Sequence, residues 1–316
     1  MTTDEAQRAF AYLLASAEPP APLTVAFVAD VGAVEAVRRI AAAEAPAPVL
    51  QEHRPGDHWS TVDRVLATAR LIHARLVTPL DDDWPTARLT TPPRHSGTAP
   101  RVAPPLALWV RGHRRLAALT DPAVSIVGAR AATAYGEHTA TELARDLSTR
   151  GVTVWSSAAL GIDGAALRGA LATSTPTVAV LAGGIDIGYP AAHATLLETI
   201  TESGLVVSEY NPGTPPSRHR FLQRSRVLAA FTAAVIVVEA GRYSGALNTA
   251  ADAASLGRPV LAIPGPVTSS LSTGPHTLIR TGRARLVTCA DDVTAAVPEL
   301  APAGSHDSPD RPQHEH

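Results

Sequence analysis

The sequence predicts an α/β fold: a doubly wound, mostly parallel β-sheet with a small helical module before it. From residue 106 onward, short runs of β-branched and apolar residues alternate with longer stretches of helical periodicity. These runs are apolar throughout instead of alternating with polar residues, as expected for strands that are buried on both faces. In residues 1–78 the apolar residues follow helical spacing. Together these observations indicate a Rossmann-like domain.

The N-terminal range 1–78 is predicted to form the helical module. Its apolar residues have helical spacing in three stretches, 4–15, 30–45 and 57–73. Residues 79–105 are irregular and contain the pairs Trp84-Pro85 and Pro92-Pro93, so they are predicted to form a linker. The acidic triplet 81–83 is interpreted as a solvated loop in preference to a metal site, because three adjacent carboxylates cannot all face one ion.

The Rossmann-like domain is predicted to span residues 106–297. Its strands are predicted at 106–110, 124–127, 152–156, 178–181, 205–208, 235–238 and 260–263. Its helices are predicted at about 135–150, 162–173, 191–203, 221–232 and 244–256. The tail 298–316 consists largely of Pro, Ser, Asp and His, a composition that predicts disorder.

Composition excludes several classes of protein. Of the 316 residues, 45% are hydrophobic and 18% charged, enough to bury a large core, and no apolar run is long enough to span a bilayer. The single cysteine, Cys289, excludes a disulfide framework and any site with several cysteine ligands. Asp4 and Glu5 lie where a signal peptide would be basic. We therefore expect a cytoplasmic protein without membrane association.

The charged residues limit which side chains could bind an anion or act in catalysis. The net charge is −2, so the chain is not a uniformly basic protein of the kind that coats nucleic acid. All 27 basic residues are arginines, which excludes a P-loop lysine and a Schiff-base lysine. Any bound anion must therefore be held by arginine side chains, by backbone N–H groups, or by both.

The ends of the predicted strands indicate where a ligand would bind. In open parallel sheets, ligands bind beyond the carboxyl ends of the strands. Nearly every predicted strand is followed by glycine or a small hydroxyl residue, which allows the backbone to approach an anion. These positions include Gly128, Ser156, Gly161, Ser244 and Gly245. Several such loops at one edge of the sheet favour a phosphate-rich ligand.

The loop after the second predicted strand argues against a dinucleotide cofactor. Its sequence is Gly128-Ala129-Arg130, which lacks the glycine pattern that binds a pyrophosphate. Arg130 stands where a closely bound pyrophosphate would need glycine. The sequence therefore predicts a phosphate held by a guanidinium group, and no cofactor.

Residues 218–226 (RHRFLQRSR) form the one dense basic cluster in the sequence. Four arginines surround Phe221 at the start of a predicted helix, a pattern that suits single-stranded nucleic acid: guanidinium groups bind phosphates and a base stacks on the ring. The alternative is a solvated helix start with Phe221 in the core. Arginines at a helix N-terminus are unfavourable because the helix dipole is positive at that end, so they need a compensating anion. This favours the interpretation that the cluster binds nucleic acid.

Four carboxylates also follow predicted strands and could act as acids or bases. They are Asp163, Asp186, Glu209 and Glu239. Asp163 is interpreted more simply as a helix N-cap. The nearest histidines, His193 and His219, are not spaced for catalysis, so we predict a protein without enzymatic activity.

Eight segments occur in the order and spacing of one known family. They are 124–136 (VSIVGARAATAYG), 156–163 (SSAALGID), 181–190 (LAGGIDIGYP), 208–213 (SEYNPG), 221–232 (FLQRSRVLAAFT), 237–250 (VVEAGRYSGALNTA), 257–265 (GRPVLAIPG) and 274–282 (GPHTLIRTG). Together they resemble the DNA-processing family DprA, also called Smf, over residues 105–293.

The resemblance implies a Rossmann-like protein that binds single-stranded DNA without catalysing a reaction. Members of this family protect incoming DNA during natural transformation, load the recombinase RecA onto it, and work as homodimers. By position, the resemblance implies DNA contacts from Arg130, Arg224, Arg226 and the small-residue loops. With the basic cluster included, the predicted DNA-binding residues are Arg130, Ser156, Gly161, Arg220, Phe221, Arg224, Arg226, Ser244 and Gly245.

An alternative from a different class remains open. The same Rossmann variant occurs in nucleotide-binding sensors of nucleotide messengers and in hydrolases that cleave nucleoside monophosphates at the glycosidic bond. Those enzymes have a Pro-Gly-Gly-x-Gly-Thr pattern with a nearby glutamate, whereas the corresponding stretch here, 239–249 (EAGRYSGALNT), lacks it. Glu239 is the candidate base under this hypothesis.

Overall fold

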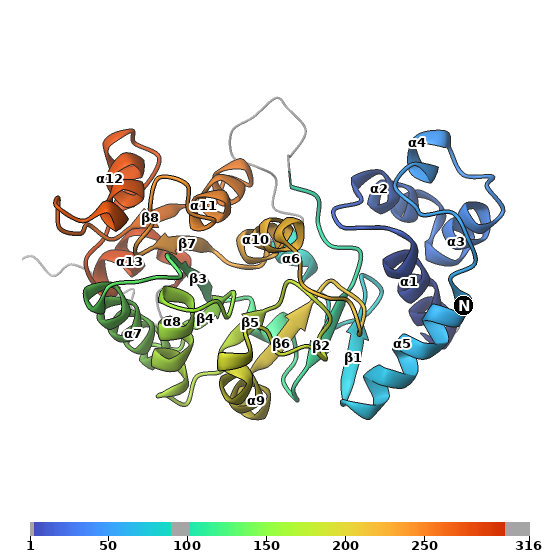
Figure 1. Ribbon diagram of the computed structural model, residues 1–316, viewed down its shortest axis with the longest axis horizontal. Coiled ribbons are helices and arrows are strands. Elements are labelled where there is room, and N and C mark those ends of the chain that lie inside the picture. The colour runs from blue at the N-terminus through green and yellow to red at the C-terminus, as the bar shows by residue number, and fades with distance from the viewer. Residues whose placement is uncertain (1–2, 90–101, 301–316) are drawn as a thin grey trace, which may run out of the picture.

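A nine-stranded sheet forms the centre of the protein (Figure 1). The computed structural model describes residues 3–89 and 102–300. The strands are β1 (Ala74–Val77), β2 (Leu108–Arg111), β3 (Ala123–Val127), β4 (Thr153–Ser156), β5 (Val178–Val180), β6 (Leu205–Ser208), β7 (Ala234–Val237), β8 (Val260–Ala262) and β9 (Arg285–Leu286). Their order is β1-β2-β6-β5-β4-β3-β7-β8-β9. β2 runs antiparallel to both its neighbours, and the other pairs are parallel, which confirms the predicted fold class.

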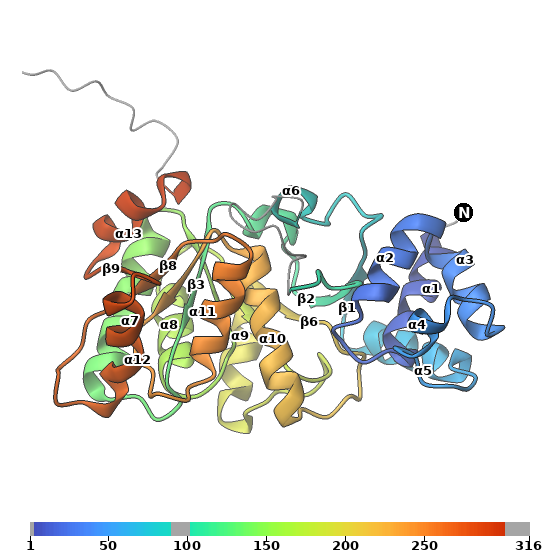
Figure 2. The same ribbon diagram turned by 90° about the horizontal axis from the view of Figure 1, so that it is seen from above.

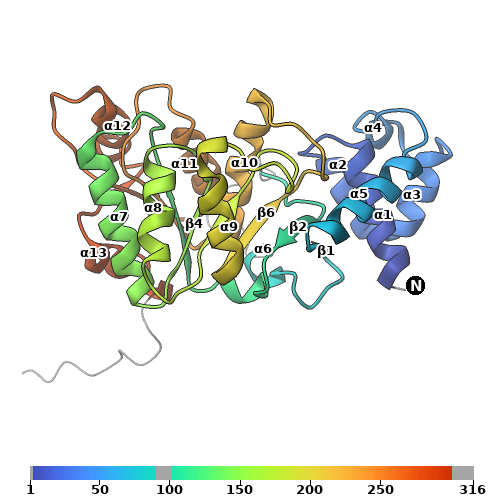
Figure 3. The ribbon, with the colours of Figure 1, turned by 60° about the horizontal axis from the view of Figure 1, so that its bottom comes forward.

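Helices cover both faces of the sheet (Figures 1 and 3). One face is covered by α7 (Ala134–Thr149), α8 (Ile162–Leu171), α9 (Ala194–Ser203) and α13 (Ala290–Ala296), and the other by α10 (Arg218–Phe231), α11 (Ala246–Ser255) and α12 (Thr273–Arg280). Successive strand residues point to opposite faces, so Val154 packs under α7 and α8 whereas Trp155 packs under α10. This double burial explains why the strands are apolar along their whole length.

The helical module lies beyond the β1 edge of the sheet (Figure 2). It consists of α1 (Thr3–Ser16), α2 (Pro22–Val31), α3 (Ala33–Ala41), α4 (Ala47–Leu50) and α5 (Trp59–Leu71). Helical spacing predicted α1, α3 and α5, but α2 was missed because its sequence, PLTVAFVADV, is apolar on nearly every side and shows no clear periodicity. The module shares one hydrophobic core with the sheet, which includes Phe10 of α1 and Trp109 of β2.

The sheet starts earlier than the sequence predicted. Residues 74–77 were placed in the helical module, but they form β1 and pair with β2. The error has a physical cause: β1 is a short edge strand that contains Arg75, so it lacks the apolar run that marked the central strands. The two-residue strand β9 was missed for the same reason.

The predicted linker contains ordered structure in its described part. A short helix, α6 (Thr86–Leu89), carries Arg88, which is buried and forms ion pairs with Asp121 and Glu299. In the acidic triplet, Asp81 accepts hydrogen bonds from Thr78, so its carboxylate has a structural partner.

Residues 3–89 and 102–300 contain no cluster of three or more potential metal ligands. None of the helices in these residues is long and apolar enough to cross a bilayer. The rest of the predicted linker, 90–101, and residues 301–316 of the predicted disordered tail lie outside the described residues.

Candidate nucleic-acid interface

The strand order reverses between β3 and β7. These strands are paired neighbours, but the chain continues from β3 to β4 on one side and from β7 to β8 on the other. The loops that follow them therefore diverge and leave a crevice at the carboxyl ends, where doubly wound sheets bind ligands. A cavity of about 790 Å³ opens at this point between residues 127–131, 218–228 and 241–249. We call it the switch-point cavity.

Arg130 and Phe221 form one wall of the switch-point cavity. Arg130 is exposed, and the central carbon of its guanidinium group lies 4.7 Å from the centroid of the Phe221 ring. The Tyr189 ring lies on another side of Phe221, with 5.4 Å between centroids. Ser217 caps α10 through a hydrogen bond from the Arg220 N–H and thereby fixes the turn that carries Phe221. Phe221 is thus half-buried at the cavity and is not part of the central core.

Arg224 lies one helical turn further along and lines the inner part of the cavity. Its side chain is buried, and Nη1 donates a hydrogen bond of 2.7 Å to the Ser157 carbonyl oxygen. Burial lowers the pKa of Arg224 to about 10, an effect opposed by the nearby carboxylate of Asp163. Its Nε has no hydrogen-bond partner among the described residues. A partly desolvated cation of this kind attracts an anion.

Asp163 and Gly161 hold the loop that carries Arg130. Asp163 accepts hydrogen bonds from the Gly128 N–H and the Ser157 hydroxyl, and burial raises the pKa of its carboxyl group. The N-cap position of α8 belongs to Gly161, so the N-cap interpretation of Asp163 is wrong. Gly161 has a φ of 72°, and a Cβ there would lie 2.4 Å from the Ala129 carbonyl oxygen. Both residues therefore fix the conformation of the loop that carries Arg130.

Three of the predicted DNA-binding residues, Ser156, Gly161 and Arg226, are buried and do not line the switch-point cavity. The Ser156 hydroxyl donates a 2.7 Å hydrogen bond to the Ile126 carbonyl oxygen and is fully buried. Arg226 is buried, and its Nη2 donates to both carboxylate oxygens of Glu209. Burial raises the pKa of Glu209, while Arg226 opposes that shift. Neither Ser156 nor Arg226 lines the switch-point cavity.

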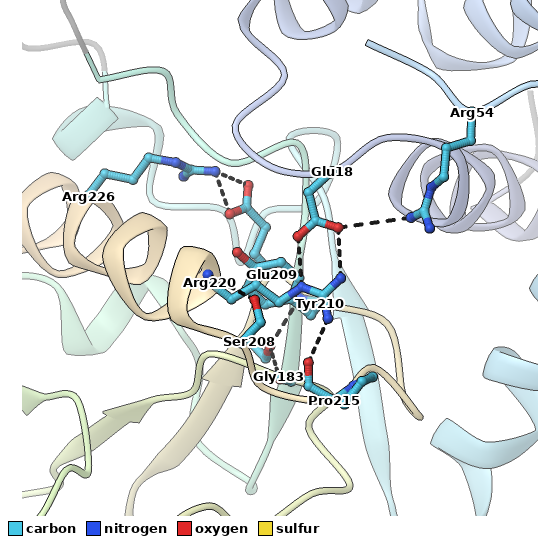
Figure 4. A network of polar contacts seen from close by, with 10 residues as sticks. Glu18, Arg54, Gly183, Ser208, Glu209, Tyr210, Pro215, Arg220 and Arg226 are labelled. Atoms are coloured by element: carbon cyan, nitrogen blue, oxygen red, sulfur yellow. Dashed lines mark hydrogen bonds and ion pairs between the residues drawn. The ribbon is translucent and has the colours of Figure 1, made fainter.

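Arg220, also predicted to bind DNA, lies outside the switch-point cavity. Figure 4 shows its guanidinium group paired with Glu18 of the helical module, at 2.7 and 2.8 Å. It also lies over the Tyr210 ring and donates to the Pro215 carbonyl oxygen. Its charge is therefore matched by a carboxylate, and it connects the module to α10 outside the switch-point cavity.

The loop after β7 forms the opposite side of the cavity. It includes the predicted residues Ser244 and Gly245, and also Arg242 and Tyr243. Tyr243 is 91% exposed, and its ring lies 5.8 Å from the Arg242 guanidinium. Sequence reasoning missed both of these residues and also gave no separate role to Arg218, another cavity residue. The sequence could have indicated them, because Arg242 and Tyr243 follow a predicted strand and Arg218 lies near the start of a predicted helix.

The candidate acid and base groups have structural partners. Glu239 is buried and accepts hydrogen bonds from the Thr133 N–H (2.9 Å) and hydroxyl (2.6 Å), so it holds the start of α7. His193 is buried, with Nδ1 2.9 Å from the Ala158 carbonyl oxygen. Neither side chain lines the switch-point cavity.

Comparison with known proteins agrees with the sequence resemblance. Residues 75–298 match the profile of the family described as DNA recombination-mediator protein A. The chain belongs to this recombination-mediator family. It is 48% identical over 301 residues to the putative DNA processing protein DprA of Mycobacterium tuberculosis, covering 93% of this chain and 76% of that protein.

Two solved structures of DprA proteins have the same fold. The Streptococcus pneumoniae protein superposes with a TM-score of 0.69 and 28% identity, over 93% of this chain and 96% of that one. The Helicobacter pylori protein, which was solved to explain its single-stranded-DNA binding mode, gives a TM-score of 0.59 and 24% identity over 72% of this chain and 97% of that one. The family match begins within β1, so it includes most of the edge strand that sequence reasoning missed.

Proposed function

We propose that the protein binds single-stranded DNA in the switch-point cavity and acts there as a recombination mediator without catalysing a reaction. One observation carries this proposal: among the described residues that line the cavity, four are arginines and only one, Asp163, is a carboxylate. The arginines are Arg130, Arg218, Arg224 and Arg242. Because Asp163 is buried and accepts hydrogen bonds from the protein itself, the accessible charge is strongly positive.

Aromatic rings beside these cations favour a polynucleotide over a single phosphate. Phe221 contacts both the Arg130 guanidinium group and the Tyr189 ring, and Tyr243 extends into solvent at the opposite side. Guanidinium groups can bind phosphates while the bases stack on these rings, and stacking is tolerant of sequence. Because the rings line an open crevice, unpaired bases can reach them and stack on them. We therefore propose that binding does not depend on base sequence.

Family membership supports the wider role. Relatives are described as DNA processing proteins, and the Helicobacter pylori protein as one that binds single-stranded DNA. We propose that this protein likewise acts in the cytoplasm as a homodimer, protects single strands during DNA uptake and recombination, and loads RecA onto them. The contacts of Glu239 support the absence of turnover, because its carboxylate holds α7 instead of facing the cavity.

Photo-crosslinking tests the proposed location. A single strand that carries 5-bromodeoxyuridine is irradiated with the protein, and the crosslinked peptides are identified by mass spectrometry. We expect crosslinks at Phe221, Tyr189 or Tyr243, because these rings would contact the bases. Crosslinks confined to surfaces away from residues 127–131, 189–190, 218–228 and 241–249 would contradict the proposal.

A further inference from the structure

A second cavity, of about 460 Å³, lies between the helical module and the loop that leads into α10. We call it the module groove. Arg54, His58 and Arg64 contribute to it from the module, and Arg220 contributes from α10. Figure 4 shows Arg54 and Arg220 approaching Glu18 from different elements. The sequence motifs include Arg220 and residues 211–213 of this groove, but they gave no sign of Arg54, His58 and Arg64, which come from a distant part of the chain.

The module groove has an excess of positive charge. Its described lining contains three arginines and no carboxylate. Glu18, the nearest acidic partner, already accepts two hydrogen bonds from Arg220 and lies 4.0 Å from Arg54. The Arg54 side chain is 65% exposed and therefore keeps donors free for another partner.

Arg64 is the least compensated of these cations. It extends from α5, and the one hydrogen bond described for its side chain is a long one of 3.4 Å to the Thr61 hydroxyl. Across residues 3–89 and 102–300, no carboxylate lies within ion-pair distance of Arg64. Arg54, whose one carboxylate partner already binds Arg220, and Arg64, which has no carboxylate partner among the described residues, are therefore suited to bind an anion.

The first turn of α10 joins the two cavities. Arg218 and Phe221 line the switch-point cavity, whereas Arg220, between them in sequence, lines the module groove. His219 is exposed on the same turn. A ligand with regularly repeated charges, longer than one nucleotide, could therefore contact both cavities by crossing the start of α10. A polynucleotide backbone has this property and a mononucleotide does not.

We propose that a single strand of DNA held in the switch-point cavity continues across the start of α10 into the module groove, where Arg54 and Arg64 bind its phosphates. This inference rests on the proposed function and extends it. The helical module thereby becomes part of the DNA-binding surface, and its junction with α10 through Glu18 and Arg220 positions the two cavities relative to each other.

The test compares oligo-dT strands of increasing length by fluorescence anisotropy. A strand of about six nucleotides fits one cavity, and a strand of about twenty reaches both. We expect the double variant Arg54→Ala/Arg64→Ala to bind the long strand 5- to 20-fold more weakly and the short strand with unchanged affinity. The magnitude of its log–log salt slope for the long strand should fall by about 1.4, for two lost phosphate contacts.

Arg70→Ala is the matched control, because Arg70 is an exposed arginine on the same helix that does not line the groove. Thermal unfolding of each variant verifies that it is folded. Unchanged affinity of the double variant for every length, or an equal loss at every length, would overturn the inference. If the wild-type protein binds but only Arg130→Ala weakens binding, the proposed function stands and the extension fails. If the wild-type protein binds no strand, both fail.

Discussion

The Arg130 guanidinium lies 4.7 Å from the centre of the Phe221 ring, although one residue follows β3 and the other belongs to the first turn of α10. Cation and ring therefore form one unit in one wall of the switch-point cavity. Such a contact contributes about 0.5–2 kcal/mol and orients both groups. A nucleotide in the cavity would meet a phosphate-binding group and a base-stacking surface that are already arranged side by side.

The first prediction concerns Arg130→Ala. Removal of this exposed guanidinium should weaken binding to oligo-dT by about 1.5–3 kcal/mol, the range for hydrogen bonds to charged groups, and leave the melting temperature nearly unchanged. Anisotropy titration measures the affinity. Arg280→Ala, which removes an exposed arginine remote from the cavity lining, serves as the control. A variant that unfolds, but binds normally for each folded molecule, would show that Arg130 is structural.

Tyr243 provides a test of stacking that involves no change in charge. Tyr243→Ala should weaken single-strand binding by about 1–3 kcal/mol, because a 91% exposed ring at the cavity can only contribute through a ligand. The salt slope should stay at the wild-type value, since no phosphate contact is lost. Tyr243→Phe keeps the ring and should restore affinity. Wild-type affinity of the alanine variant would remove Tyr243 from the binding surface.

Arg226 should behave as a structural residue. Arg226→Ala leaves the buried Glu209 carboxylate without its partner, so we expect unfolding to require about 3–5 kcal/mol less free energy. The double variant Glu209→Met/Arg226→Met removes both charges and should recover most of the loss. Chemical denaturation measures both. Reduced DNA affinity of Arg226→Ala without reduced stability would restore Arg226 as a DNA contact.

His53 should make the helical module sensitive to acid. Its ring nitrogens lie 2.7 Å from the Ser16 hydroxyl and 2.9 Å from the Thr24 hydroxyl, and burial lowers its pKa to about 4. The unfolded state, with a pKa near 6.5, takes up the proton first. The stabilisation is therefore complete above pH 6.5 and is lost as the pH falls towards 4.

We expect this loss to be about 1–2 kcal/mol after allowance for the partial exposure of the ring. Urea denaturation at pH 7 and pH 5 measures it. His53→Gln should lose less stability between these two pH values than the wild type does. His138→Gln, a change at an exposed histidine of α7, should keep the wild-type dependence. Equal pH dependence of all three proteins would contradict this account.

The central strands could be predicted from sequence because burial on both faces leaves a continuous apolar signature, as in β3 and β7. The edge strand β1 has no such signature, because Arg75 interrupts it and only part of it is buried. The position of the switch-point cavity could be predicted from the strand ends, since Arg130 and Ser244 both line it.

Side-chain direction was harder to predict. Arg224 and Arg226 are two positions apart on α10 and so point about 200° apart around the helix, which means that they could not both face one cavity. This much could have been deduced from the sequence. The partners of Arg226 and Arg220, Glu209 and Glu18, come from distant segments and become neighbours only in the folded chain. The module groove depends on the same kind of long-range contact and left no local signal.

The preference for single-stranded DNA is tested most directly by measuring the binding of oligo-dT and of a duplex of equal length across a salt series. The account predicts tighter binding of the single strand at every salt concentration, with a log–log slope of about −0.7 for each phosphate contacted. It also predicts similar affinities for single strands of different sequence. Tight binding of the duplex together with weak binding of oligo-dT would contradict it.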